Sequence, residues 1–397
     1  MFPLVCAVSF ALLLLTSKQP INCAFKILDG LKFIILSDDA IKTYHIPDKV
    51  LAKKSKSVRN DLVEYYLHSM TQQLLEGLPY LSDFQYLWTT FLTGVGSEIA
   101  CLVLGLLPIK SLGSQINMFY YGMIVIFIIL IRFGISTSFN RRLHRRFAVG
   151  YSVIVAIIIF FLLRQFSFGI FEFRPILLSI WDVPPIFLDI FTSILVGFIA
   201  YSLSTPMLYE LFIERQITNV RRNIPQFQFA IEIYLKAQKY VRKIVVSTSR
   251  STVLPFLILF LMQYLYKFGF DTYLTIAYVV SSIVISIMNL KCVHTNVQLL
   301  TFTSLHSVAE FDEKRSFNSG RNAQASLQRS LLMIPVSAMS LSMYPMMKIV
   351  LAMTYTTSFV MKGVVKELAR RTSLFAMMIT DLVMAGNKIF SVFMPYE

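Results

Sequence analysis

Nine apolar segments constrain the fold of this chain more than any other feature of its sequence. They lie at 2–15, 86–108, 117–136, 147–163, 186–206, 252–270, 272–290, 331–361 and 372–395. Most hold about 17–23 residues, the length that an α-helix needs to cross roughly 30 Å of hydrocarbon. The segments are continuous, whereas the strands of a membrane β-barrel alternate between apolar and polar residues. The sequence therefore predicts an all-α fold, a polytopic integral membrane helical bundle of eight or nine transmembrane helices.

The composition agrees with this class. Of the 397 residues, 56% are hydrophobic, whereas soluble domains have about 45–50% apolar residues. We expect one multi-span membrane domain over 1–397 that binds the lipid bilayer. Its expected parts are a first helix or signal peptide (2–15), a basic loop with an amphipathic helix (16–85), spans two to five (86–206), a cytoplasmic amphipathic basic helix (207–251) and spans six to nine (252–395).

The first segment allows two interpretations. It is short for a span and resembles the apolar core of a signal peptide. However, no Lys or Arg precedes 2–15, and no small-x-small cleavage site follows it directly. We therefore favour an uncleaved first helix, with a signal peptide as the alternative.

Basic residues predict the orientation. The net charge is +15, and most of the 37 Lys and Arg residues lie in 16–85, 137–146, 207–251 and 291–330. Loops rich in Lys and Arg stay in the cytoplasm, so the N-terminus is predicted to lie outside. The basic stretch 362–371 is an exception, because it falls on the opposite side. No basic stripe with interleaved aromatics occurs, so we expect no nucleic-acid partner.

Three loops carry patterns of their own. In 16–85, the linker AKKSKSVR precedes apolar residues at helical spacing, namely Leu62, Tyr65, Tyr66, Leu67, Met70, Leu74 and Leu75. In 207–251, FQFAIEIYLKAQKYVRKIVV is typical of a helix in the inner membrane interface, or of a partner-binding helix. The polar stretch 311–330 is predicted to be a mobile loop.

Signatures of chemistry are absent from the sequence. It has no nucleotide-binding loop, no G-x-S-x-G and no H-E-x-x-H, which are motifs of known catalytic sites. The four cysteines and five histidines have no metal-site spacing. We expect no catalytic, cofactor-binding or metal-binding residues, and no enzyme.

Several charged residues interrupt the apolar segments. Arg132 and Lys348 have long side chains that can reach toward a membrane interface. Asp189 lies near the outer end of its segment, where it can reach the headgroups. Glu98, in LTGVGSEIACLVLG, is short and about ten residues from either end of 86–108, and such residues usually face the bundle and find a partner.

The neighbours of Glu98 predict a packing seam. Thr93, Ser97, Cys101 and Gly105 recur every fourth residue, and Thr90 and Gly94 form the adjacent row that leads to Glu98. Small residues at this spacing let helices approach closely. We expect an intramembrane charge pair of Glu98 with Arg132, or a protonated Glu98 hydrogen-bonded to a neighbouring helix. A role of Glu98 in moving ions or protons stays open.

The order of features resembles the transmembrane protein 161 family. The residues that carry the resemblance are TYHIPDKVLAKKSKSVR (43–59), the span with Glu98, Arg132 near the end of the next span, IFTSILVGFIAYSLSTPMLYELFIERQITN (190–219), VVSSIVISIMNLKCVHTNVQLL (279–300) and SLLMIPVSAMSLSMYPMMKIVLAM (330–353). The resemblance implies a multi-span membrane protein linked to excitable-cell and developmental phenotypes.

These observations favour a non-catalytic, multi-pass protein of the plasma membrane or an endomembrane. We expect it to modulate other membrane proteins, such as ion channels, or ion currents. The alternatives are an ion channel or transporter, and a seven-span chemoreceptor, which would place its N-terminus in the cytoplasm. A membrane enzyme is the third class.

Overall fold

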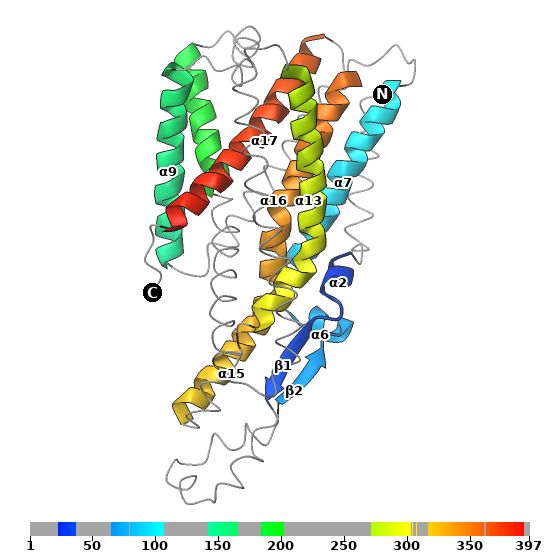
Figure 1. Ribbon diagram of the computed structural model, residues 1–397, viewed down its shortest axis with the longest axis vertical. Helices are drawn as coiled ribbons and strands as arrows, with labels where there is room; N and C mark the ends of the chain where they lie inside the picture. The colour runs from blue at the N-terminus through cyan, green and yellow to red at the C-terminus, as the bar shows by residue number, and fades with distance from the viewer. Residues whose placement is uncertain are drawn as a thin grey trace, which may run out of the picture.

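The computed structural model describes residues 23–36, 65–78, 80–106, 142–165, 184–201, 271–302, 304, 307, 317–360 and 363–392. This part of the chain is helical apart from one small sheet (Figure 1). The predicted segments 2–15, 117–136 and 252–270, and the basic helix of 207–251, lie outside the described residues.

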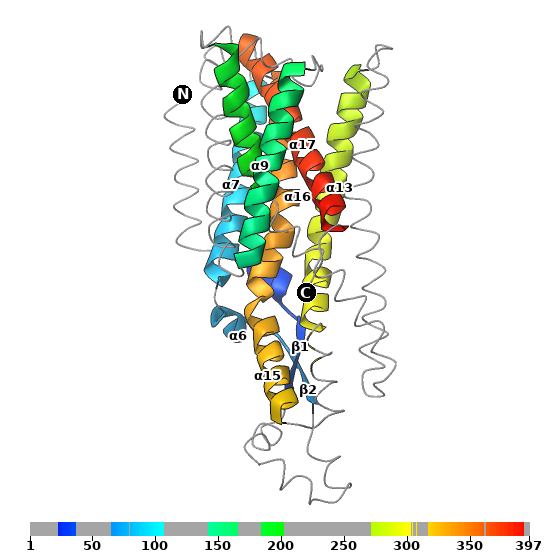
Figure 2. The ribbon, with the colours of Figure 1, turned by 90° about the vertical axis from the view of Figure 1, so that its left-hand side faces the viewer.

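Long helices form where the apolar segments predict them. They are α7 (Leu81–Leu106), α9 (Arg142–Gln165), a helix over Pro185–Tyr201, α13 (Asp271–Phe302), α16 (Ile334–Thr357) and α17 (Gly363–Val392). Both views show these helices along the long axis of the molecule, with α17 crossing the others obliquely (Figures 1 and 2). α7 and α16 begin at the end where α13 finishes, which also holds α15 (Phe317–Leu332) and is called the α15 end below.

α16 is the central helix. It packs against α13, α7 and α17, and 89% of its most apolar 18-residue window is buried. Pro335 stands in its first turn, where a missing N–H is tolerated because the first helical N–H groups have no partner in the helix. Pro345 lies inside the helix and removes one backbone hydrogen bond there. The short helix η5 (Ser358–Val360) ends the element.

Two helices among the described residues are long and apolar enough to cross a membrane, Tyr273–Gln298 and Ile334–Val360. The apolar parts of two others, Ala148–Phe161 and Pro185–Tyr201, are shorter. The two long ones differ in position, because only 33% of the corresponding window in α13 is buried. α13 therefore lies at the outside of the bundle, and α16 lies inside it.

A two-stranded sheet corrects the prediction for 16–85. β1 (Lys32–Leu36) pairs with β2 (Tyr65–Ser69) in antiparallel register, with Phe33 opposite His68. The predicted amphipathic helix is therefore wrong at 65–69, and within the described residues 65–78 the helical part is α6 (Gln72–Glu76). Aromatic and β-branched residues favour strands. β1 supplies the backbone hydrogen-bond partners of β2, and the spacing of apolar residues in 62–75 gave no sign of this pairing.

The sheet is attached to the α15 end of the bundle. β1 contacts α13 and α15, and α2 (Cys23–Leu28) contacts α7 and α13. His294 in α13 lies with Nδ1 2.7 Å from the backbone oxygen of Ile27. This polar contact fixes the N-terminal elements on the last turns of α13.

Two loops predicted at the ends of spans are helical instead. Residues 317–332 form α15, because Ala323 and Leu327 are buried on one face and supply the apolar contact that a polar composition hides. Residues 363–371 are the first turns of α17 rather than a loop. There Glu367 lies 3.3 Å from the Nε of Arg371, an i,i+4 pair that supports a helix.

Candidate functional site

Two buried carboxylates meet α16 from different neighbours. Asp381 comes from α17 and is 5% exposed, and Glu98 comes from α7 and is 6% exposed. An ionised carboxylate in an apolar interior is costly unless charges or hydrogen bonds compensate it. The side chains that surround each carboxylate therefore define two polar centres in the described part of the bundle.

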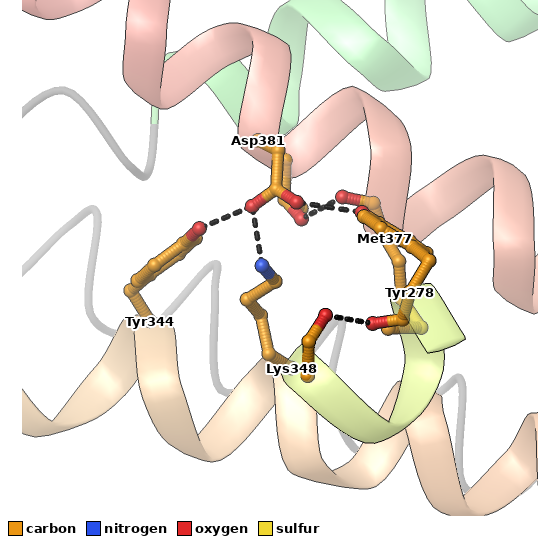
Figure 3. A network of polar contacts seen from close by, with 7 residues as sticks. Tyr278, Tyr344, Lys348, Met377 and Asp381 are labelled. Carbon is orange, nitrogen blue, oxygen red and sulfur yellow. Dashed lines mark hydrogen bonds and ion pairs between the residues drawn. The ribbon is translucent and has the colours of Figure 1, made fainter. Parts of the chain in front are cut away.

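Asp381 is bound by side chains of two other helices (Figure 3). The Nζ of Lys348 lies 2.5 Å from Oδ1 of Asp381. The hydroxyl of Tyr344 donates to the same oxygen, and the hydroxyl of Tyr278 donates to Oδ2 at 2.6 Å. Tyr344 and Lys348 are four residues apart on α16, so they lie on one face of the helix. We call these four residues the Asp381 centre.

The Asp381 centre neutralises its own charge. Lys348 is 1% exposed, and its Nζ lies 5.4 Å from the ring centre of Tyr344 and 5.9 Å from that of Tyr278. Both distances are within the range of cation–π attraction. Since an ion pair with additional hydrogen bonds compensates the loss of water best, this arrangement ties α13, α16 and α17 together.

A second contact holds α17 beside this centre. The hydroxyl of Tyr151 in α9 donates to the backbone oxygen of Val383 at 2.8 Å. A Cβ atom on Gly386 would lie 2.8 Å from this hydroxyl, closer than real Cβ contacts. Glycine at 386 therefore leaves the room that the tyrosine needs.

Glu98 is bound by hydroxyl groups. Thr354 donates to Oε1 of Glu98 at 3.0 Å, and Thr357 donates to Oε2 at 2.8 Å. One turn earlier, a Cβ on Gly94 would lie 3.8 Å from Val350. Since 94 and 98 on α7 meet 350 and 354 on α16, the two helices run in the same direction. We call Glu98, Thr354 and Thr357 the Glu98 centre.

Each threonine of the Glu98 centre has a second acceptor. The hydroxyl of Thr354 is also 3.0 Å from the oxygen of Val350, and that of Thr357 is 3.0 Å from the oxygen of Thr354. A hydroxyl has one hydrogen to donate. The carboxyl group and the helix carbonyls therefore share two donors, and these hydroxyls keep an acceptor on their own helix if the carboxylate is removed.

The structure tests the predicted site residues to different extents. Glu98 faces a neighbouring helix as predicted, with threonine hydroxyls on its oxygens. Arg132 lies outside the described residues, so the Glu98–Arg132 pair stays a prediction. The proposed seam residues Thr93, Ser97, Cys101 and Gly105 all lie on α7, and the contacts of their side chains are outside the described part of the structure.

Two other predictions for charged residues are wrong. Lys348 does not reach an interface, because its side chain is buried against Asp381. Asp189 is 2% exposed and faces the bundle rather than the headgroups. The sequence did contain a signal for the Asp381 centre, namely opposite charges at 348 and 381 in consecutive apolar segments. Nothing in the sequence marked Tyr278, Thr354 or Thr357 as their partners.

The two centres bind helices to one another and neutralise buried charge. Within the described ranges, no group of three or more His, Cys, Asp or Glu side chains could hold a metal ion. Comparisons with protein-family models, curated proteins and solved structures found no match to this chain.

Proposed function

We propose that this chain is a multi-pass integral membrane protein that acts on other membrane proteins without catalysing a reaction. One observation carries the membrane part of this proposal: charged side chains lie within the apolar core, while many large apolar side chains cover the outside of the described helices. Glu98, Lys348 and Asp381 are buried, whereas large apolar side chains are exposed. Extensive exposed apolar surface is unfavourable in water and marks membrane or protein contacts.

Most of the exposed large apolar residues lie on three helices. Phe161 is 58% exposed, Phe187 62% and Ile194 64%. The others on these helices are Val149, Val153, Ile154, Ile157, Ile158, Ile186, Ile190, Phe191, Tyr273, Ile276, Val280, Val284, Ile287 and Met288. They belong to α9, to Pro185–Tyr201 and to α13. In a bilayer, lipid chains would cover these faces, so the apolar side chains would not be exposed to water.

Helix length supports the same proposal. α13 has 32 residues, which span about 48 Å at 1.5 Å per residue, against roughly 30 Å of hydrocarbon. Its last turns, with α15 and the sheet, would therefore project beyond the hydrocarbon at the α15 end. Arg329 and Lys291 lie at this end, as the positive-inside rule expects of a cytoplasmic face.

Membrane insertion is tested by alkaline extraction and by engineered glycosylation sites. We expect the chain to stay with the membrane at high pH, and a site placed in 37–64 to remain unmodified because this stretch is predicted to be cytoplasmic. A site in 166–183 is expected to be glycosylated. Release of the chain at high pH would overturn the membrane proposal, and glycosylation in 37–64 would reverse its orientation.

The action on other proteins rests on the resemblance to the transmembrane protein 161 family, and ion channels are the partner class that it suggests. Co-expression with a voltage-gated channel should change the current amplitude or its gating, measured by patch clamp. Purified chain in liposomes should pass no ions. Flux through the purified chain, without any effect on the channel, would replace this proposal.

Transport by the chain itself is the second candidate, and the Asp381 centre favours it. Ionisable residues buried in a membrane protein often mark ion or proton paths. Flux in liposomes that Asp381→Asn abolishes and Asp83→Asn leaves unchanged would support transport. Asp83 is a suitable control because it lies in the first turn of α7, away from the Asp381 centre.

A further inference from the structure

Two rows of buried polar side chains extend from the Asp381 centre. On α16 the row consists of Lys348, Tyr344, Ser340 and Ser337, and on α13 it consists of Thr275, Tyr278, Ser282 and Ser286. Both rows follow the same spacing of three, four and four residues, which keeps their members on one helix face. All eight side chains are at most 6% exposed.

The two rows face each other. α13 and α16 pack together along the bundle and run in opposite directions (Figures 1 and 2). Tyr278 of one row lies beside Lys348 of the other, so the serines that follow Tyr278 on α13 meet those that precede Tyr344 on α16. Lys348 and Ser337 are separated by about 16 Å along the helix axis. The paired rows therefore run from the Asp381 centre toward the α15 end.

Two serine hydroxyl groups in the α16 row lack a hydrogen-bond partner within the described part of the chain. Among the described residues, neither Ser337 nor Ser340 has a hydrogen-bond partner for its buried hydroxyl, and the ammonium of Lys348 has no acceptor beyond its ion pair. By contrast, Ser342 on another face of α16 donates to the oxygen of Ala338 at 2.7 Å. Buried polar groups without a protein partner are usually hydrogen-bonded to ordered water.

The α16 row does not continue on the other side of the Asp381 centre. Leu351 and Tyr355 continue the same side of α16 toward the opposite end, and both are at most 2% exposed. The ring of Tyr355 packs edge-on against Phe359 at 5.4 Å. On this side of Tyr278 the rows hold one further polar side chain, Thr275, whereas the serines of both rows lie on the α15 side. The polar side chains therefore continue mainly toward the α15 end.

We propose that the facing rows of α13 and α16 hold a file of ordered water that connects the Lys348–Asp381 pair to the α15 end. Water in this file accepts from Lys348 and bridges the serine hydroxyls, which gives each molecule the two or more polar partners that it needs. The buried pair then exchanges protons with one side of the membrane. This role goes beyond the proposed action on other proteins.

The proposal is tested by the reactivity of single cysteines in a background with Cys6, Cys23, Cys101 and Cys292 replaced by serine. Silver ions, which are close to water in size, are applied to sealed vesicles from one side at a time, and the remaining thiol is measured after unfolding. We expect Ser337→Cys and Ser340→Cys to react on the order of tenfold faster than Ser342→Cys, since reaction requires a hydrated thiolate.

The control variant decides the result. If all three cysteines react equally slowly, or equally fast through local opening, the water file is overturned. The difference in rate tests the file, whereas its restriction to the α15 side tests the membrane topology, so the two failures are distinguishable.

Hydroxyl-radical labelling of the unsubstituted protein provides a test that needs no variant to fold. Water next to a side chain is the source of the radical, so Tyr278 and Tyr344 should be oxidised several-fold faster than Tyr151, which is also buried and whose hydroxyl donates to the backbone oxygen of Val383. Oxidation of Tyr151 at the same rate or faster would overturn the proposal.

Discussion

The Asp381 and Glu98 centres each compensate a buried carboxylate, but with different chemical groups. Both bury a carboxylate against α16, yet Asp381 has an ammonium group and two phenols, whereas Glu98 has two threonine hydroxyls. Removal of the cation from the first leaves a buried charge alone. Removal of the carboxylate from the second leaves hydroxyls that return to carbonyls of their own helix. The two centres should therefore differ in how much a substitution destabilises the protein.

The largest effect is expected for Lys348→Met. This change leaves Asp381 ionised and buried without its counter-charge, and the loss of one partner of a buried ion pair costs about 3–5 kcal/mol. The free energy of unfolding in detergent, or the folded yield by fluorescence-detected size exclusion, measures it. The double variant Lys348→Met with Asp381→Asn should recover part of the loss. Equal losses from the single and double variants would show that the ion pair does not matter.

A smaller effect is expected for Glu98→Ala, about 1–3 kcal/mol, because two hydrogen bonds are lost without stranding a charge. The matched variant Glu98→Gln retains an acceptor and should cost less than about 1 kcal/mol. Thermal unfolding of both variants beside Asp381→Asn compares the two centres directly. A Glu98→Gln variant as unstable as Asp381→Asn would mean that Glu98 also pairs with a cation.

Arg132 is the candidate for such a cation. If the predicted pair forms, Glu98→Ala lowers the folded yield more than Glu98→Ala combined with Arg132→Ala, because the double variant leaves no unpaired charge. The yields of the two single variants and the double variant, measured in parallel, provide the cycle. Additive losses would assign Glu98 to Thr354 and Thr357 alone.

The smallest effects concern the glycines beside each centre. Gly386→Ala places a methyl group 2.8 Å from the hydroxyl of Tyr151, so this side chain must shift and weaken its hydrogen bond to Val383, which is worth about 1 kcal/mol. Gly94→Ala meets Val350 at an ordinary 3.8 Å and should be neutral or slightly stabilising. Melting temperatures in the same detergent compare them, and a greater loss for Gly94→Ala would contradict the packing of α7 on α16.

Sequence patterns predict the long helices better than their partners. Continuous apolar runs located α7, α9, α13, α16 and α17, because hydrophobicity over many residues is a property of the chain itself. The same runs missed β2, since Tyr65 and Leu67 have apolar spacing that suits a helix as well as a strand. Only the pairing with β1, about thirty residues earlier, selects the strand.

The site was only partly predictable for a similar reason. Glu98 is conspicuous in an apolar segment, and its inward orientation followed from its depth. Its threonine partners are more than 250 positions away, among many other hydroxyls in apolar segments. Lys348 and Asp381 were visible as charges, but their contact depends on the oblique crossing of α17 (Figure 1), which no local pattern encodes.

The separation of Glu98 from its partners has a consequence for biosynthesis. The contacts with Thr354 and Thr357 join residues 256 and 259 positions apart. At about 5–20 residues per second, the ribosome needs roughly 13–50 s to make the intervening chain. If α7 inserts into a membrane as proposed, its carboxyl group is there throughout that interval, before its final partners exist. A temporary neighbour, from an earlier part of the chain or from the insertion machinery, would then shield Glu98 until α16 replaces it.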